Sequence, residues 1–127
     1  MRLDGWKAAA VAAGMGLGLL LAAGAGAEEV AEADAAEAKS IYDARCTTCH
    51  GPGGKGDGAA AAALNPKPRD LTSDEWQKSV TDEHIEKIIL SGGPAVGMSP
   101  LMPPNPDLNA KPGVVDGLRQ IVRGFGK

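Results

Sequence analysis

Apolar side chains recur at helical spacing near the end of the chain. Five of them lie on one face of a predicted helix, which begins near Pro112 and ends near Gly126: Val115, Leu118, Ile121, Val122 and Phe125. Proline suits the first turn of a helix because the N–H that it lacks has no intrahelical partner there. The pattern therefore predicts a terminal helix that packs through this face.

A second amphipathic pattern follows Thr81, which stands where an N-cap residue is expected. Ile85, Ile88 and Ile89 form its apolar face, and acidic residues lie near the positive end of the helix dipole. The Ser-Gly-Gly-Pro run at 91–94 ends it. We therefore expect a helix between residues 82 and 90.

Two further helices are predicted, one at about 33–45 and a short one that Ser73 caps and that carries Trp76. The segments between the predicted helices are rich in glycine and proline, namely 51–58, 65–69 and 92–110. No part of residues 28–127 alternates with period two. The sequence predicts an all-α fold of about four helices.

The first 27 residues resemble a secretory signal. Arg2 and Lys7 precede a run without charge from Ala8 to Ala27, which ends in a cleavage-type Ala-Gly-Ala. We expect a signal peptide at 1–27, a flexible Ala/Glu-rich tether at 28–37 and one domain at 38–127. We therefore expect the protein to be exported to the periplasm. The alternative is an uncleaved N-terminal anchor, because the run is long enough to cross a bilayer.

Composition narrows the functional classes. Without residues 1–27 the chain keeps 11 basic and 15 acidic residues, a formal charge of −4, which argues against binding nucleic acid or an anionic membrane surface. The whole chain holds one Phe, one Tyr and two Trp. So few aromatic residues make a thin core for a polypeptide alone, and a buried prosthetic group would complete it.

The segment Cys46-Thr47-Thr48-Cys49-His50 carries the most specific chemistry, because it has the pattern of a c-type haem attachment site. The two cysteines, the only ones in the chain, lie one helical turn apart. Both thiols can therefore form thioethers to one porphyrin, and His50 can ligate its iron.

A redox disulfide and a zinc site are the alternatives for this pair of cysteines. The redox interpretation requires a βαβ pattern nearby, and none is present. The zinc interpretation requires four ligands, and the second histidine, His84, lies 34 residues beyond His50. Haem is the favoured interpretation.

Over residues 36–125 the chain resembles the small single-haem class I c-type cytochromes. The resemblance rests on four segments in order: a helix running into CTTCHG, GKGDG with LNPKPRDL, GMSPLMP at 97–103, and the terminal helix at 115–123. It departs from the family where Ala38 replaces a frequent Gly, and where Ile121 replaces a frequent Tyr in the terminal helix. Both replacements keep an apolar contact where the terminal helices cross.

The resemblance implies one haem c, bound covalently through Cys46 and Cys49, with His50 and a Met sulfur as axial iron ligands. Met102, in a Met-Pro-Pro context, is the favoured distal ligand, and Met98 is the alternative. A thioether ligand raises the reduction potential relative to a second histidine.

Several residues around the predicted haem have both a functional and a structural interpretation. The family implies that His50 donates its other N–H to a carbonyl of a proline-containing loop, which points to Pro66, and the alternative is a plain turn proline. Trp76 and Arg69 either bond a haem propionate or serve as packing and solvated charge, respectively. We interpret His84 as a surface histidine.

The resulting functional hypothesis is a monomeric, diffusible one-electron carrier and not an enzyme, which meets redox partners transiently. Its negative charge favours basic partners. A haem subunit of a larger dehydrogenase or oxidase is the first alternative. A haem sensor or small-ligand enzyme with an open iron site is the second.

Overall fold

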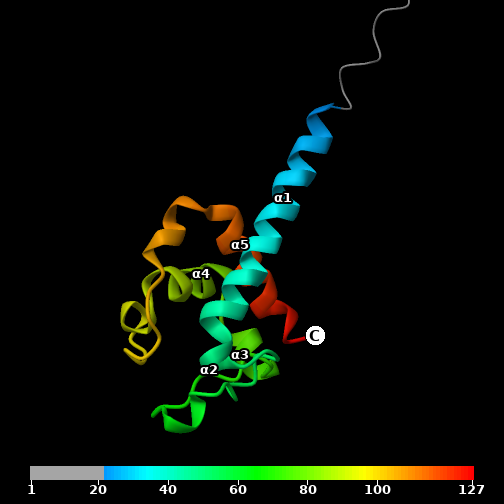
Figure 1. Ribbon diagram of the computed structural model, residues 1–127. Coiled ribbons are helices and arrows are strands. Elements are labelled where there is room, and N and C mark those ends of the chain that lie inside the picture. Colours follow the sequence, from blue (N-terminus) through cyan, green and yellow to red (C-terminus); the bar gives the residue numbers. More distant parts are fainter. Residues whose placement is uncertain (1–21) are drawn as a thin grey trace, which may run out of the picture.

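The computed structural model describes residues 22–127, so most of the predicted signal peptide lies outside the described residues. The α-helices are α1 (Ala22–Ile41), α2 (Thr47–His50), α3 (Asp74–Ser79), α4 (Asp82–Ser91) and α5 (Pro112–Gly124). Between them lie a π-helical turn, η1 (Tyr42–Cys46), and three 3₁₀ turns, η2 (Ala61–Ala63), η3 (Gly93–Val96) and η4 (Pro106–Ala110). This part of the chain contains no strand, and the all-α prediction is confirmed (Figure 1).

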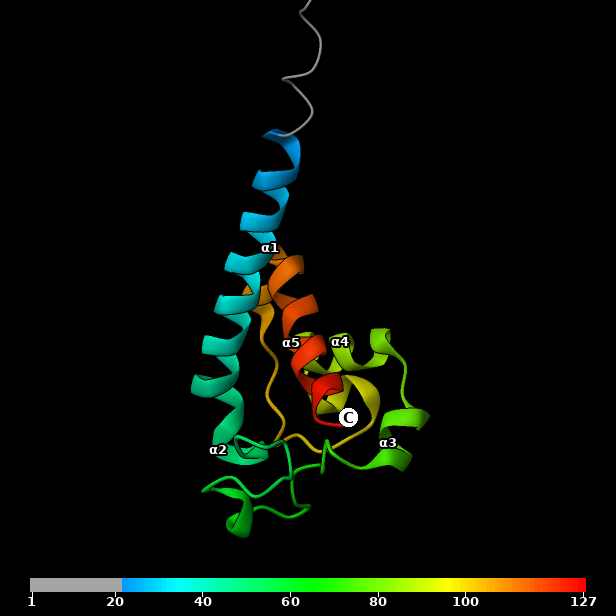
Figure 2. The same ribbon diagram turned by 90° about the vertical axis from the view of Figure 1, so that its right-hand side faces the viewer.

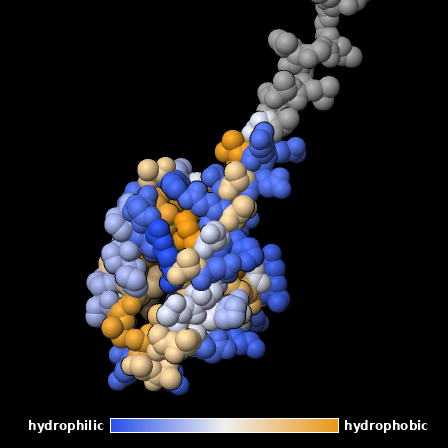
Figure 3. All heavy atoms as spheres, viewed as in Figure 1, coloured by the Kyte–Doolittle hydropathy of each residue, from blue (hydrophilic) through white to orange (hydrophobic). Residues whose placement is uncertain are grey.

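The Ala/Glu stretch 28–37 is helical, which differs from the flexible tether that its composition suggests. Alanine and glutamate are strong helix formers, and the second half of the stretch gains contacts with α5. There Glu37 pairs with Lys111, and Asp34 lies against Gly113. The first half projects beyond the body of the protein as an exposed arm with a largely hydrophilic surface (Figures 1 and 3). Within the described residues, none of the helices combines the length and apolar character needed to cross a bilayer.

The two terminal helices, α1 and α5, lie against each other (Figure 2). Ala38 on α1 is completely buried and faces Gly117 on α5. A Cβ atom at Gly117 would lie 2.7 Å from the Cβ of Ala38, closer than two carbon atoms can approach. The small residue that the family pattern places at 38 is therefore supplied here by the partner helix.

The buried side chains form two clusters. The first combines Ala38, Tyr42, Leu108, Val114, Val115 and Leu118, and the second combines Leu71, Ile85 and Val122. Ile89 and Phe125, both partly buried, pack against the two clusters. The predicted apolar face of α5 is thus confirmed at Val115, Leu118 and Val122.

Both short-range helix signals are confirmed. The Thr81 hydroxyl accepts a hydrogen bond from the backbone N–H of His84 (3.2 Å), and the Ser73 hydroxyl accepts one from that of Trp76 (3.3 Å). Each satisfies a donor that the first helical turn leaves unpaired. The predicted loop at 92–110 contains two 3₁₀ turns, η3 and η4, each with a proline among its first two residues.

Two arginines tie α5 to the region where α3 ends and α4 begins. Arg123 donates to the Asp82 carboxylate (2.7 Å) and to the Val80 carbonyl (2.8 Å), and Arg119 donates to the other oxygen of Asp82 (2.6 Å). These bonds lower the pKa of Asp82, the hydrogen bond from Arg123 being the largest cause. Asp82 therefore joins the first turn of α4 to the terminal helix.

Candidate functional site

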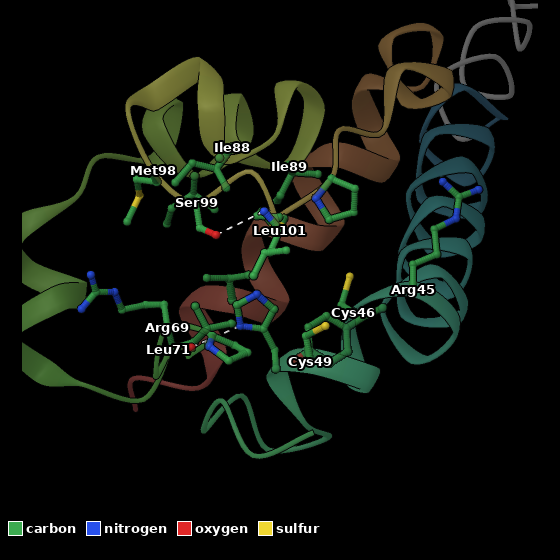
Figure 4. A pocket seen from close by; sticks show the side chains of 18 of the residues that line it. Arg45, Cys46, Cys49, Arg69, Leu71, Ile88, Ile89, Met98, Ser99 and Leu101 are labelled. Carbon is green, nitrogen blue, oxygen red and sulfur yellow. Dashed lines mark hydrogen bonds between the residues drawn. The ribbon is translucent and has the colours of Figure 1, made fainter. Parts of the chain in front are cut away.

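A cavity of about 450 Å³ lies between the Cys46–His50 segment and the loop that follows α4 (Figure 4). It is within the size range of small-molecule and cofactor sites. Its wall draws on every α-helix and on two loops, 64–71 and 93–105. Much of the lining is aliphatic: Ile41, Leu64, Leu71, Ile85, Ile88, Ile89, Leu101, Leu118 and Val122.

Cys46 and Cys49 both line the cavity, and both are free thiols. Cys46 is the last residue of the π-helical turn η1, and Cys49 follows in α2. π-Helical turns occur frequently at functional sites. Burial raises the pKa of the Cys46 thiol to about 11, so this thiol is protonated at neutral pH. A reactive redox cysteine needs a lowered pKa, and Cys46 lacks one.

His50 ends α2 and lines the cavity between the two loops. Its Nδ1 lies 3.2 Å from the carbonyl oxygen of Arg69, a contact that occupies this nitrogen when it carries the proton. Burial lowers the pKa of His50, and the Arg69 contact only partly opposes the shift. A neutral imidazole with Nε2 available is the form that binds a metal.

The carbonyl that faces His50 corrects the expectation at Pro66. Pro66 lines the cavity, but the acceptor is Arg69, three residues further along the same loop. The N–H of Leu71 donates to the carbonyl of Gly54 (2.7 Å), which holds residues 69–71 beside the glycine loop that follows His50. A proline-containing loop was the right segment, and the tertiary bond to Gly54 decides which carbonyl it presents.

Met98 and Met102 both line the cavity, within the loop that follows α4. Figure 4 shows Met98 and Leu101 across the pocket from Cys46 and Cys49. Met98 is 41% exposed, whereas Met102 is half-buried. The Met102 carbonyl accepts a hydrogen bond from the N–H of Gly93 (3.0 Å). The structure thus places both sulfur-bearing residues on this loop at the cavity.

A glycine with positive φ admits the Met102 backbone to its position. Gly92 has φ of 75°, and a Cβ there would lie 2.8 Å from the Met102 carbonyl oxygen. A larger residue would be strained in this conformation and would also collide with the loop. The glycine that ends α4 therefore brings the Met102 loop close to the helix.

Three other predicted residues are placed by the structure. Trp76 lines the cavity and is partly buried, and Arg69 lines it with an exposed side chain. His84 is half-buried and is not part of the lining. The four residues that a zinc site would combine, the two cysteines and the two histidines, are therefore not brought together.

Arg45 and Asn105 also line the cavity, and sequence reasoning missed both. Arg45 Nη1 lies 3.2 Å from the Asn105 side-chain oxygen and 3.0 Å from the Asp107 carboxylate. The partners are 60 residues apart in the chain. Neither residue stands out by periodicity, and the only signal is position, one residue before Cys46 and three after Met102.

The donor set fits an apolar, planar ring that carries a metal. Two thiols lie one helical turn apart on one wall, a neutral imidazole adjoins them, and two methionines on the loop after α4 line the cavity as well. Thioether and imidazole are both known axial ligands of haem iron, and the aliphatic lining suits a porphyrin face. The residues therefore match the haem attachment that the sequence motif predicts.

Comparison with known proteins agrees with this chemistry. The model of the family described as cytochrome c oxidase, cbb3-type, subunit III matches residues 33–115. The chain is also similar to a solved structure described as KustC0563 c-type cytochrome, with 32% sequence identity and a TM-score of 0.51. That match covers 71% of this chain and 98% of the other. None of the curated proteins matches the chain.

Proposed function

The chain belongs to the family of cytochrome c domains described as cytochrome c oxidase, cbb3-type, subunit III, and on this premise we propose that it is an exported carrier of single electrons with one haem c. The observation that carries the proposal is the aliphatic cavity that combines Cys46, Cys49 and His50 with the Met loop. When bound, haem c supplies an Fe(III)/Fe(II) couple that accepts and releases one electron.

Cys46 and Cys49 hold the haem in this proposal. Each thiol would hold the porphyrin through one thioether bond, its sulfur on one carbon of a vinyl group and its hydrogen on the other, with the vinyl double bond becoming a single bond. The position of both thiols on the cavity wall supports the assignment. His50 would hold the iron through Nε2, while the Arg69 carbonyl orients its ring through Nδ1.

Met102 is the distal ligand that we propose. It is less exposed than Met98, its backbone is fixed to Gly93, and prolines at 103 and 104 stiffen the chain after it. Because this loop is already restrained, little conformational entropy would be lost when the Met102 sulfur binds the iron. With His50 and Met102 both on the iron, no substrate would reach the metal, and the protein would act as a carrier and not as an enzyme.

Its partners are redox proteins, as for a cytochrome domain in general. We propose that they dock transiently on a monomer, since small interfaces suffice for electron-transfer encounters. The formal charge of −4 on residues 28–127 favours basic partners.

Absorption spectra of the purified, exported protein test this function. They are recorded oxidised, reduced, and reduced under CO. The expected result is a covalent low-spin haem whose reduced spectrum does not change under CO. A spectrum that changes at once would show an open distal position and would favour the haem sensor.

A haem subunit of a larger complex is the second candidate, and two observations favour it. The matching family is described as an oxidase subunit, and the helical arm at the start of α1 projects from the domain. An affinity-tagged protein purified from its native membranes in mild detergent tests this candidate. Stoichiometric recovery of a second chain would support the complex, whereas recovery of the cytochrome alone would support the free carrier.

A further inference from the structure

We propose that Arg45 and Asn105 form a clasp, which fixes the Met102 loop to the helix that carries Cys46 and so positions the distal ligand. The inference rests on the proposed ligation by His50 and Met102. It assigns a role to the two cavity residues that the sequence motifs do not include.

Asn105 is the fixed point of the loop. Its side-chain nitrogen donates to the Ile89 carbonyl (2.9 Å), and its backbone N–H donates to the Leu90 carbonyl (3.0 Å). Both acceptors belong to the last turns of α4, whose carbonyls have no intrahelical partner. Asn105 therefore caps the end of α4 while its side-chain oxygen remains available.

Arg45 uses that oxygen. Its guanidinium bonds the Asn105 oxygen at 3.2 Å and the Asp107 carboxylate at 3.0 Å from the same nitrogen, Nη1. Asp107 belongs to η4, which Leu108 anchors in the core with 1% exposure. The guanidinium thus ties the helix before Cys46 to the end of the Met102 loop.

The loop has few other attachments of this kind. Residues 91–105 contain no charged residue, and among the hydrogen bonds of the described residues the Arg45–Asn105 bond is the one that brings a charged side chain to this stretch. Met102 is held at its own carbonyl by the Gly93 N–H, and the next attachment along the chain is Asn105, three residues later. Without the Arg45 contact, Asn105 keeps only its bonds to α4, and the C-terminal side of the ligand loop is no longer held to the helix before Cys46. This loosening shifts the balance between sulfur bound and sulfur released.

Imidazole binding to the ferric protein measures that balance, because imidazole enters only when the sulfur leaves the iron. We expect Arg45→Ala and Asn105→Ala each to increase the apparent imidazole affinity by up to about fivefold, the scale of a charged contact that is partly exposed to solvent. The double variant is expected to gain less than the product of the two single gains, because both changes break the same contact.

Two controls separate positioning from general stability. Asn109→Ala removes an amide in the same η4 turn, which bonds only the Pro106 carbonyl, and should leave imidazole affinity unchanged. Val114→Ala opens the core at a buried residue that does not line the cavity. If this variant loses as much unfolding free energy and gains the same imidazole affinity, the clasp acts only through stability and the proposal is wrong.

Amide hydrogen exchange tests the clasp independently of which residues ligate the iron. Faster exchange of the Gly93 and Met102 amides in Arg45→Ala, with the Asn109→Ala control unchanged, is expected whatever ligates the iron. Unchanged exchange and unchanged imidazole affinity would overturn the clasp. Rapid CO binding by the unsubstituted protein would instead overturn the His–Met ligation.

Discussion

The Cβ of Ala38 occupies the space that a side chain on Gly117 would need. The distance to a Cβ built at Gly117 is 2.7 Å, and the Cα of Ala35 lies 3.6 Å from the same point. The atom in the way belongs to a short side chain in a fully buried position, so it cannot swing aside. The crossing of α1 and α5 is therefore set by a small pair, one residue on each helix.

Gly117→Ala is expected to destabilise the protein by about 1–3 kcal/mol, the usual cost of overpacking a core. This loss would outweigh the gain of up to about 1 kcal/mol that alanine gives over glycine inside a helix. Gly124→Ala is the matched control, because a Cβ there meets no atom within 4 Å. Urea unfolding gives both values, and a stabilised Gly117→Ala would show that the helices can separate freely.

The attachment residues are tested by covalent haem yield. Cys46→Ala and Cys49→Ala should each lower the amount of haem that remains bound after acid–acetone extraction, and the double variant should retain none. Mass spectrometry of the denatured protein reads the attachment directly. Thr48→Ala, between the cysteines, is the control for expression. Full covalent incorporation in both single variants would remove the attachment assignment.

Replacing the distal ligand should move the reduction potential. Met102→Ala is expected to open the sixth position to CO and to lower the potential by a sizeable part of the roughly 0.8 V over which axial ligands set haem potentials. Met98→Ala should leave both properties unchanged, since Met98 is 41% exposed. Potentiometric titration with CO difference spectra distinguishes the two, and the reverse result would transfer the ligand to Met98.

Acid stability should depend on Asp82. Its pKa in the folded protein is lowered by Arg123 and then Arg119, below the value of about 3.9 of an unfolded aspartate. Its contribution is therefore present above about pH 4 and is lost as the pH falls through the folded-state pKa. Asp82→Asn should lower the melting temperature at pH 6 and should make it depend less on pH in the acid range.

Asp74→Asn is the control for that experiment. Asp74 is likewise the first residue of a helix, but its partner is the exposed Lys78 at 3.3 Å. Surface pairs of this kind contribute little. If both variants change the melting temperature between pH 2 and 6 in the same way, the Arg119 and Arg123 contacts have no special weight.

Export predicts the first residue of the mature protein. Cleavage after Ala27 would leave Glu28 at the N-terminus, and intact-mass measurement of the periplasmic fraction should show that start. Ala27→Leu places a large residue at the cleavage site and should slow processing, whereas Glu29→Gln should not. A mature protein that keeps residues 1–27 in the membrane fraction would favour the anchored alternative.

Local signals predicted much of this structure, and long-range contacts account for what they missed. The caps at Ser73 and Thr81 and the apolar face of α5 depend on neighbours within one or two turns, so the sequence shows them directly. The carbonyl that faces His50 depends on a bond between Gly54 and Leu71, 17 residues apart. The Arg45–Asn105 contact spans 60 residues.

The helical state of residues 28–37 had a different cause. Low hydrophobicity and high charge suggested a tether, but alanine and glutamate also favour helix, and a partner for Glu37 lies 74 residues away on Lys111. That Cys46, Cys49 and His50 line one cavity could be predicted from the sequence, because they lie within five residues of one another. Which residues face them across the cavity depends on tertiary structure.

The hydrophobic core of this protein consists of two separate clusters. Two small clusters of buried side chains meet mainly through Ile89 and Phe125, and the cavity takes part of its wall from each, Tyr42 and Leu118 from one and Leu71 and Val122 from the other. An occupant of the cavity would add contacts with both clusters. A rigid haem between the two clusters would contact both. The cofactor, and not the polypeptide alone, would then make the protein unfold as one cooperative unit.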